Sequence, residues 1–120
     1  REPNVKSFME INRYHVSLLP YLLDRLDGLT EGGQTLLDKT AIVYGSPMGD
    51  PNVHNHKRCP LIFLGGGNGA FTGNLHLKAA DGTPMANPML SLMHGLGMED
   101  MPSFGDSTGE FTFNSATATP

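Results

Sequence analysis

The sequence predicts an α/β fold with few strands, flanking helices and long loops rich in glycine and proline. Two short apolar runs, 41–44 and 61–64, carry branched or aromatic side chains and are bounded by glycine or proline, as is typical of buried strands. Segments 5–27 and 88–96 have apolar residues at spacings of three and four, as in amphipathic helices. We therefore expect the two runs to be neighbours in one sheet packed by both helices. Their relative direction stays open, because a 16-residue connection allows a crossover without requiring one.

The first predicted helix has a single apolar stripe. It consists of Phe8, Ile11, His15, Leu18, Leu22 and Leu26. Pro20 is expected to bend this helix or split it in two, and Gly28 is expected to end it. His15 lies on the stripe, which favours a core histidine with one hydrogen-bond partner. A flexible turn at Gly32 and Gly33 then leads toward the first strand.

The second predicted helix follows two polar-proline pairs, Thr83-Pro84 and Asn87-Pro88, which are typical of helix starts. Its stripe ends at Gly97, and its methionines favour packing over cofactor binding. Residues 1–113 are predicted to form one α/β domain or part of a larger one. Residues 114–120 are polar and small, which predicts a disordered tail.

Composition excludes several classes of function. The 120 residues include 24 glycines and prolines and carry a formal charge of -4 without a basic cluster, which argues against nucleic acid as a partner. No apolar run approaches the roughly 20 residues of a membrane-spanning helix. The single cysteine, Cys59, excludes an internal disulfide. Two apolar helical stripes in so short a chain predict exposed surface, and hence a homodimer or higher oligomer.

The polar loop between the strands carries the candidate chemistry. Asp50, Asn52, His54 and His56 occupy alternate positions, which share one side in an extended backbone. Extended chain over this stretch spans about 20 Å, whereas zinc ligands lie about 2 Å from the ion. Either the loop curls, or only neighbours such as the two histidines share an ion. The alternative is that these are ordinary turn residues with solvated or backbone-bonded side chains.

A glycine-rich segment, 65–73, follows the second strand. Gly65-x-Gly67-x-x-Ala70 matches a dinucleotide-binding fingerprint, but strand or loop is predicted after it instead of the required helix, so nucleotide binding is rejected. The glycines are expected to let the chain turn beside the histidine loop, where Gly66 and Gly67 present backbone N–H groups to an anion. His76 is either a surface histidine, which its position favours, or a further group facing the loop.

Several motifs in order resemble one family. They are Ile11-Asn-Arg-Tyr-His15, Leu36-Leu-Asp-Lys-Thr40, Tyr44-Gly-Ser-Pro-Met-Gly-Asp50-x-Asn52-x-His54-x-His56, Pro60-Leu-Ile-Phe-Leu-Gly-Gly-Gly67, Gly82-Thr-Pro84 and Ser103-Phe-Gly-Asp-Ser-Thr-Gly109. Over about 4–111 the chain resembles the bacterial secreted proteins called HXXSHH, or domain of unknown function 1552. It looks like the C-terminal part of a protein several times longer. That family is distantly similar to the alkaline phosphatase and sulfatase superfamily, whose later metal ligands follow a core strand.

The resemblance implies a C-terminal fragment of an alkaline-phosphatase-like three-layer fold, periplasmic or secreted, from a metal-dependent phosphate or sulfate ester hydrolase. It implies a divalent metal, zinc above all, on Asp50, His54 and His56. In this interpretation Asn52 orients a ligand or the substrate anion, and we expect Gly66, Gly67 and His76 to contact the anion beside it. The superfamily's nucleophile and remaining ligands lie in an earlier half, so no catalytic residue is assigned here. The fragment alone is expected to be inert, and its partner is the ester or the N-terminal part of the same protein.

The superfamily uses an Asp-His pair and a distant histidine, which His54-Asn-His56 reproduces poorly. A competing prediction is therefore a non-catalytic binding or interaction module, in which the histidine loop only bonds to itself. A metallopeptidase-like hydrolase is a weaker alternative, because the sequence contains no H-E-x-x-H motif.

Overall fold

The computed structural model describes residues 2–113 and mixes helices with two small sheets, which agrees with the predicted α/β class at that level. The elements in chain order are α1 (Glu2–Asp27), β1 (Thr30–Glu31), β2 (Gln34–Thr35), α2 (Leu36–Lys39), β3 (Ile42–Gly45), β4 (Leu61–Leu64), the 3-10 turn η1 (Gly67–Gly69) and α3 (Ala86–Gly95). Both predicted helices and both predicted strands are present. The predicted disordered tail, 114–120, lies outside the described residues.

The two predicted strands pair with each other, as expected. β3 and β4 are antiparallel, with Ile42 opposite Leu64 and Gly45 opposite Leu61, so no crossover connects them. The strands are half-buried instead of buried: Ile42 is half-covered, whereas Val43 and Ile62 are exposed. A hairpin of only two strands buries one face at most, since no further strand or layer covers the other.

Helix α1 is a single helix of 26 residues that continues through Pro20, so the predicted split does not occur. It ends as predicted, with the Gly28 N–H donating to the Asp24 carbonyl oxygen at 3.0 Å. None of its residues is buried, and His15 is exposed, so the prediction of a core histidine is wrong. Within residues 2–113, no helix combines the length and apolar character needed to cross a membrane.

Helix α2 is one turn long and is held by side chains at its start. The Thr35 hydroxyl accepts from the Asp38 N–H at 3.1 Å, while the Asp38 carboxylate accepts from the Thr35 N–H at 3.0 Å. This reciprocal cap satisfies two amides that a helix start leaves free. Before it, Gly32 and Gly33 adopt positive φ angles of 60° and 81°, which let β1 and β2 form a tight hairpin.

The chain returns to α2 after β4. The Gly66 N–H donates to the Leu37 carbonyl oxygen at 2.9 Å, and the Gly67 N–H donates to that of Thr40 at 3.0 Å. Gly65 has a φ of 87°, and a Cβ atom there would lie 2.2 Å from the Thr40 oxygen. Only glycine fits this approach, because any side chain would collide with backbone.

The interior is small. Among the described residues only Gly67, Ala86, Asn87 and Leu90 are buried. Four phenylalanines from three segments also form a cluster: Phe63, Phe71, Phe111 and Phe113, with ring centroids 5.0 to 5.8 Å apart and mostly edge-to-face contacts. The exposed surface of 9093 Å² exceeds the roughly 6,300 Å² expected for a compact 12.9 kDa chain.

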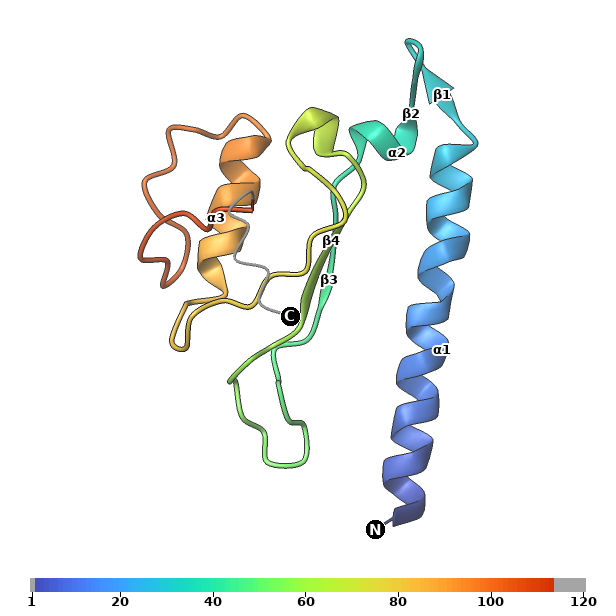
Figure 1. Cartoon of the computed structure of the whole chain (residues 1–120), viewed down its shortest axis with the longest axis vertical. Coiled ribbons are helices and arrows are strands. Elements are labelled where there is room, and N and C mark those ends of the chain that lie inside the picture. Colours follow the sequence, from blue (N-terminus) through green and yellow to red (C-terminus); the bar gives the residue numbers. More distant parts are fainter. Residues whose placement is uncertain (1, 114–120) are drawn as a thin grey trace.

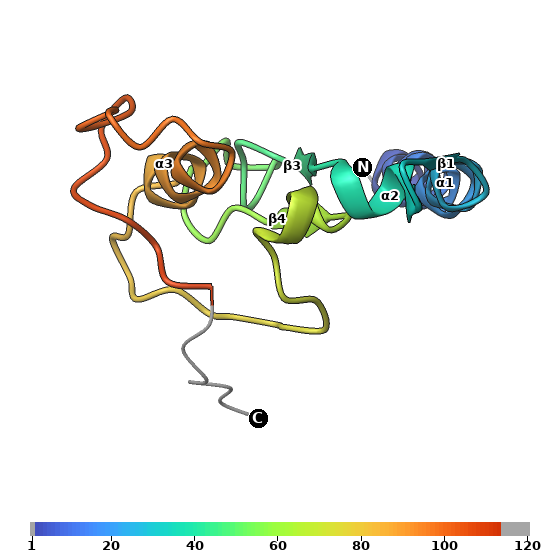
Figure 2. The ribbon, with the colours of Figure 1, turned by 90° about the horizontal axis from the view of Figure 1, so that it is seen from above.

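The elements stand in a row instead of in layers. Figures 1 and 2 show α1 and α2 at one end, the β3–β4 hairpin in the middle and α3 at the other end. Helix α1 packs mainly on α2, and β4 reaches the C-terminal segment through the phenylalanine cluster. The prediction that both helices pack directly on the two strands is therefore wrong. The radius of gyration, 16.3 Å, is larger than the roughly 13.6 Å of a compact chain of this length.

The return of the chain to α2 is testable by substitution. We expect Gly65→Ala to lower the free energy of unfolding by about 2–4 kcal/mol, because the new methyl group meets the Thr40 carbonyl at a positive φ. Gly73→Ala is the matched control. A Cβ atom at Gly73 meets nothing within 4 Å, and the φ angle of Gly73 lies outside the left-handed region that favours glycine. Urea unfolding followed by circular dichroism measures both. Equal stability of the two variants would contradict this account of the contact.

Candidate functional site

The histidine loop, residues 46–60, joins β3 to β4 and closes on itself. The Gly49 N–H donates to the Asn55 carbonyl oxygen at 3.0 Å, and the Asn55 N–H donates to that of Asp50 at 3.3 Å. Residues 51–54 form the turn between them, and His54 has a φ of 52°. The chain is therefore not extended here. The premise that His54 and His56 share one side with Asp50 is wrong, because it required a continuous strand.

The polar side chains of the loop serve this turn. The Asp50 carboxylate accepts from the Asn52 N–H at 2.9 Å, which is the usual way an aspartate stabilises a turn. The Asn55 side-chain oxygen accepts from the N–H groups of Asp50 and Lys57, both at 3.3 Å. The sequence analysis did not single out Asn55, although Asn is a common turn residue.

His56 is the one loop histidine whose ring is fixed by a described hydrogen bond. Its Nδ1 lies 2.7 Å from the Pro47 carbonyl oxygen. A carbonyl only accepts, so Nδ1 carries the proton and Nε2 keeps its lone pair. The Cys59 thiol donates to the same oxygen at 3.1 Å. Sequence reasoning considered Cys59 only as a disulfide candidate, and nothing in its spacing indicated that it lies on the same carbonyl as His56.

The predicted ligand set does not assemble in the described chain. Within residues 2–113, no three His, Cys, Asp or Glu side chains form a group that could hold a metal ion. Asp50, His54 and His56 are all exposed. A zinc ion needs about four ligands at about 2 Å, which these three side chains do not bring together. Asp50, His54 and His56 therefore do not form a zinc site by themselves. The ring of His56 is nevertheless held through Nδ1, as is common for a metal-binding histidine.

The predicted anion contacts are also dispersed. Gly66 and Gly67 follow the far end of β4, so the length of the hairpin, roughly 10 Å, separates them from the histidine loop. Their N–H groups are already donated to carbonyls of α2. The two glycines therefore turn beside α2 and not beside the histidine loop, and anion binding by them stays a prediction. His76 is exposed, as its position favoured, and lies on the irregular segment 71–85.

A groove of about 540 Å³ lies between α1 and the hairpin end that carries the loop. Phe8, Asn12 and Val16 line one side, and the other includes Tyr44, Met48 and Pro60. The three helix residues are four apart, so they define the side of α1 that faces the rest of the chain. These walls are mostly apolar, with no charged side chain among the lining residues, and do not suit an anionic ester.

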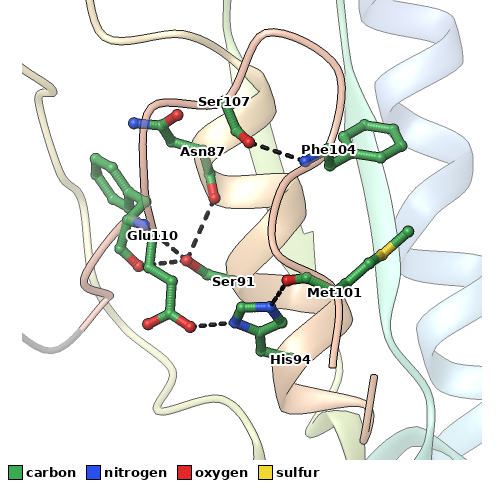
Figure 3. Close-up of polar contacts among 8 residues, drawn as sticks. Asn87, Ser91, His94, Met101, Phe104, Ser107 and Glu110 are labelled. Atoms are coloured by element: carbon green, nitrogen blue, oxygen red, sulfur yellow. Dashed lines mark hydrogen bonds and ion pairs between the residues drawn. The ribbon is translucent and has the colours of Figure 1, made fainter. Parts of the chain in front are cut away.

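A second polar cluster escaped the sequence analysis. Asn87, Ser91 and His94 lie on one face of α3 and hold the strap, defined as residues 101–113 (Figure 3). The Asn87 side chain exchanges two hydrogen bonds with Thr108, at 2.9 and 3.2 Å. The Ser91 hydroxyl accepts a hydrogen bond from the Phe111 N–H at 2.7 Å and donates one to the Phe111 carbonyl oxygen at 2.9 Å. The spacing of three and four is visible in the sequence, but the partners of these side chains lie 7 to 21 residues away.

His94 is positioned as a cation. Its Nδ1 faces the Glu110 carboxylate and its Nε2 lies 2.7 Å from the Met101 carbonyl oxygen (Figure 3). Both partners are acceptors, so only the doubly protonated ring satisfies both. The hydrogen bond with Glu110, then that with Met101, raises the pKa of His94 above the ordinary value. Because both ring nitrogens are occupied, this histidine fixes the strap and is not free for catalysis.

Comparison of the chain with protein-family models, curated proteins and solved structures returned no match. Function therefore has to be argued from the molecule itself.

The strap contact should depend on pH. Since the pKa of His94 is raised in the folded chain, its contribution to stability is complete below about pH 6.5 and is lost as pH rises through the folded-state pKa. We expect a proton NMR titration to place the His94 midpoint above 6.5, and Glu110→Gln to lower it. Asp106→Asn, which removes another strap carboxylate, is the control and should leave the midpoint unchanged. A midpoint insensitive to Glu110→Gln would refute the assigned cause.

Proposed function

We propose that the chain is a non-catalytic interaction module that binds a protein partner through the outward side of α1. One observation carries this proposal: a 26-residue helix contributes no buried residue, yet presents a row of large apolar side chains. Isolated apolar residues on a surface are ordinary, but a continuous row of them along one helix marks a surface that another chain covers.

The row is distinct from the side of α1 that packs within the chain. The inner side includes Leu19, Leu23 and Leu26, which are half-buried. The outer face is defined here by five residues: Ile11, Tyr14, Leu18, Tyr21 and Leu22, exposed by 54%, 62%, 48%, 70% and 43%. At 100° per residue the two sets are centred about a third of a turn apart. The contacts that the chain already makes through the inner side of α1 therefore leave the outer face uncovered.

The histidine loop supports the same proposal by its own bonding. The Asp50 carboxylate, the Asn55 amide and the Nδ1 atom of His56 are all used to shape the turn. Catalytic groups are instead held so that they converge on a substrate. A loop that satisfies itself in this way provides a stable shape beside α1, with no chemistry assigned to it.

The outer face should be dispensable for folding of the single chain. At about 1 µM protein, we expect Leu18→Glu to change the free energy of unfolding by less than about 0.5 kcal/mol. Leu26→Glu is the matched variant on the half-buried side and should cost about 1–3 kcal/mol, because it places a charge against α2. Thermal unfolding by circular dichroism compares them. A loss for Leu18→Glu as large as for Leu26→Glu would mean that this chain itself covers the outer face.

A second candidate function is the metal-loop region of an alkaline-phosphatase-like hydrolase acting on phosphate or sulfate esters. The observation that favours it is His56, whose Nδ1–H is held by a backbone carbonyl while Nε2 is left as a lone-pair donor. Zinc-binding histidines are commonly oriented by such a bond. In this proposal His56 supplies one ligand, and the remaining ligands come from outside the residues described. Nothing else in the loop is assigned a role in hydrolysis.

Zinc titration tests the metal candidate. If the loop binds metal, isothermal calorimetry on the purified chain should give weak zinc binding that His56→Ala abolishes and His76→Ala, the exposed control histidine, leaves intact. The single variant His54→Ala, which keeps His56, then reports whether His54 adds a second ligand. Equal zinc binding by the wild type and the double variant His54→Ala, His56→Ala would eliminate the metal candidate. The interaction proposal does not depend on this result.

A further inference from the structure

The spacing of the apolar residues on α1 indicates what covers the outer face. Ile11, His15, Leu18 and Leu22 follow steps of four, three and four, which is the repeat of a coiled-coil seam. Tyr14 and Tyr21 flank this seam one heptad apart, and both are well exposed. A repeat of this kind packs against a second helix with the same repeat. The chain carries that repeat itself, on a helix whose inner side is already in use.

We propose that the outer face of α1 pairs with the outer face of a second copy of this chain, with the two helices antiparallel about a two-fold axis. The axis passes between Val16 and Ser17. Ile11 of each copy then lies against Leu22 of the other, and His15 lies against Leu18. This proposal rests on the interaction function proposed above and names its partner.

The antiparallel direction follows from the polar residue of the seam. In a parallel pair His15 would meet its own copy at the centre, and two imidazoles facing each other repel when both are charged. In the antiparallel pair each His15 lies on an apolar leucine with its ring edge toward solvent. Opposed helix dipoles also favour the antiparallel arrangement.

The area is sufficient for a reversible dimer. The five outer-face residues together with His15 offer roughly 600 Å² per copy, at the low end of specific protein interfaces. The chain as a whole exposes more surface than a compact chain of its mass. Burying the outer face in a dimer would bring its exposed area closer to that of a compact chain. Self-association on this scale should be dynamic and should depend on concentration.

Light scattering after size exclusion, from about 1 to about 500 µM, tests the proposal. We expect the wild-type mass to rise from 12.9 kDa toward twice that value. Leu18→Glu should weaken association on the order of 30-fold or more, because it places a charge in the seam. Met9→Glu is the control, because Met9 is 58% exposed on the opposite side of the same helix. The dimer of this variant should have the same dissociation constant as the wild-type dimer.

Two results would overturn the dimer. One is a wild type that stays at 12.9 kDa throughout the range. The other is a dimer that Leu18→Glu leaves unchanged, since the copies would then associate elsewhere. The unfolding of Leu18→Glu in a monomeric protein separates this failure from that of the interaction function. Stability close to that of the wild type means that the outer face is free for a different protein, whereas a loss as large as that of Leu26→Glu means that the chain covers it itself, and both proposals fall.

Discussion

The arrangement of the whole chain depends on two backbone hydrogen bonds at the end of α2. There Gly66 and Gly67 donate to Leu37 and Thr40, after the turn at Gly65. Helix α2 also contacts α1 and β2, so this one turn of helix connects the long N-terminal helix to everything after β4. The connection tolerates no side chain at Gly65, since a Cβ atom there would overlap the Thr40 carbonyl. The fold therefore relies on close backbone contact in place of a large apolar core.

That attachment places the histidine loop at the free end of the hairpin. Ile42 and Leu64 pair at the end of the hairpin nearest to α2, and the loop lies beyond the other end, at Gly45 and Leu61. A loop so far from the attachment receives few partners from the rest of the chain, so its polar groups bond to one another. Asp and Asn side chains commonly bond to nearby backbone N–H groups in such turns. Any metal role would fall to His56 with ligands from elsewhere.

The sequence predicted the elements better than their surroundings. Periodicity located α1, α3 and both strands, because local patterns determine where regular structure forms. It failed wherever the outcome depended on distant partners. Alternation at Asp50 and His54 suggested a shared side, but alternation means this only in a strand, and His54 adopts a left-handed conformation. His94 was passed over because its acceptors, Met101 and Glu110, lie in an irregular strap that no local pattern connects to α3.

Helix α1 illustrates how a sequence can contain more apolar surface than its own fold uses. Its apolar residues extend over about two-thirds of the helix circumference, whereas α2 and the groove cover only one side. Proline in a helix interior costs about 3 kcal/mol relative to alanine, so Pro20 makes α1 a poor helix without tertiary support. The inner contacts at Leu19, Leu23 and Leu26 supply part of that support near its C-terminal end. Covering the outer face from Ile11 to Leu22 would stabilise the stretch on both sides of Pro20, so partner binding and the integrity of α1 are coupled.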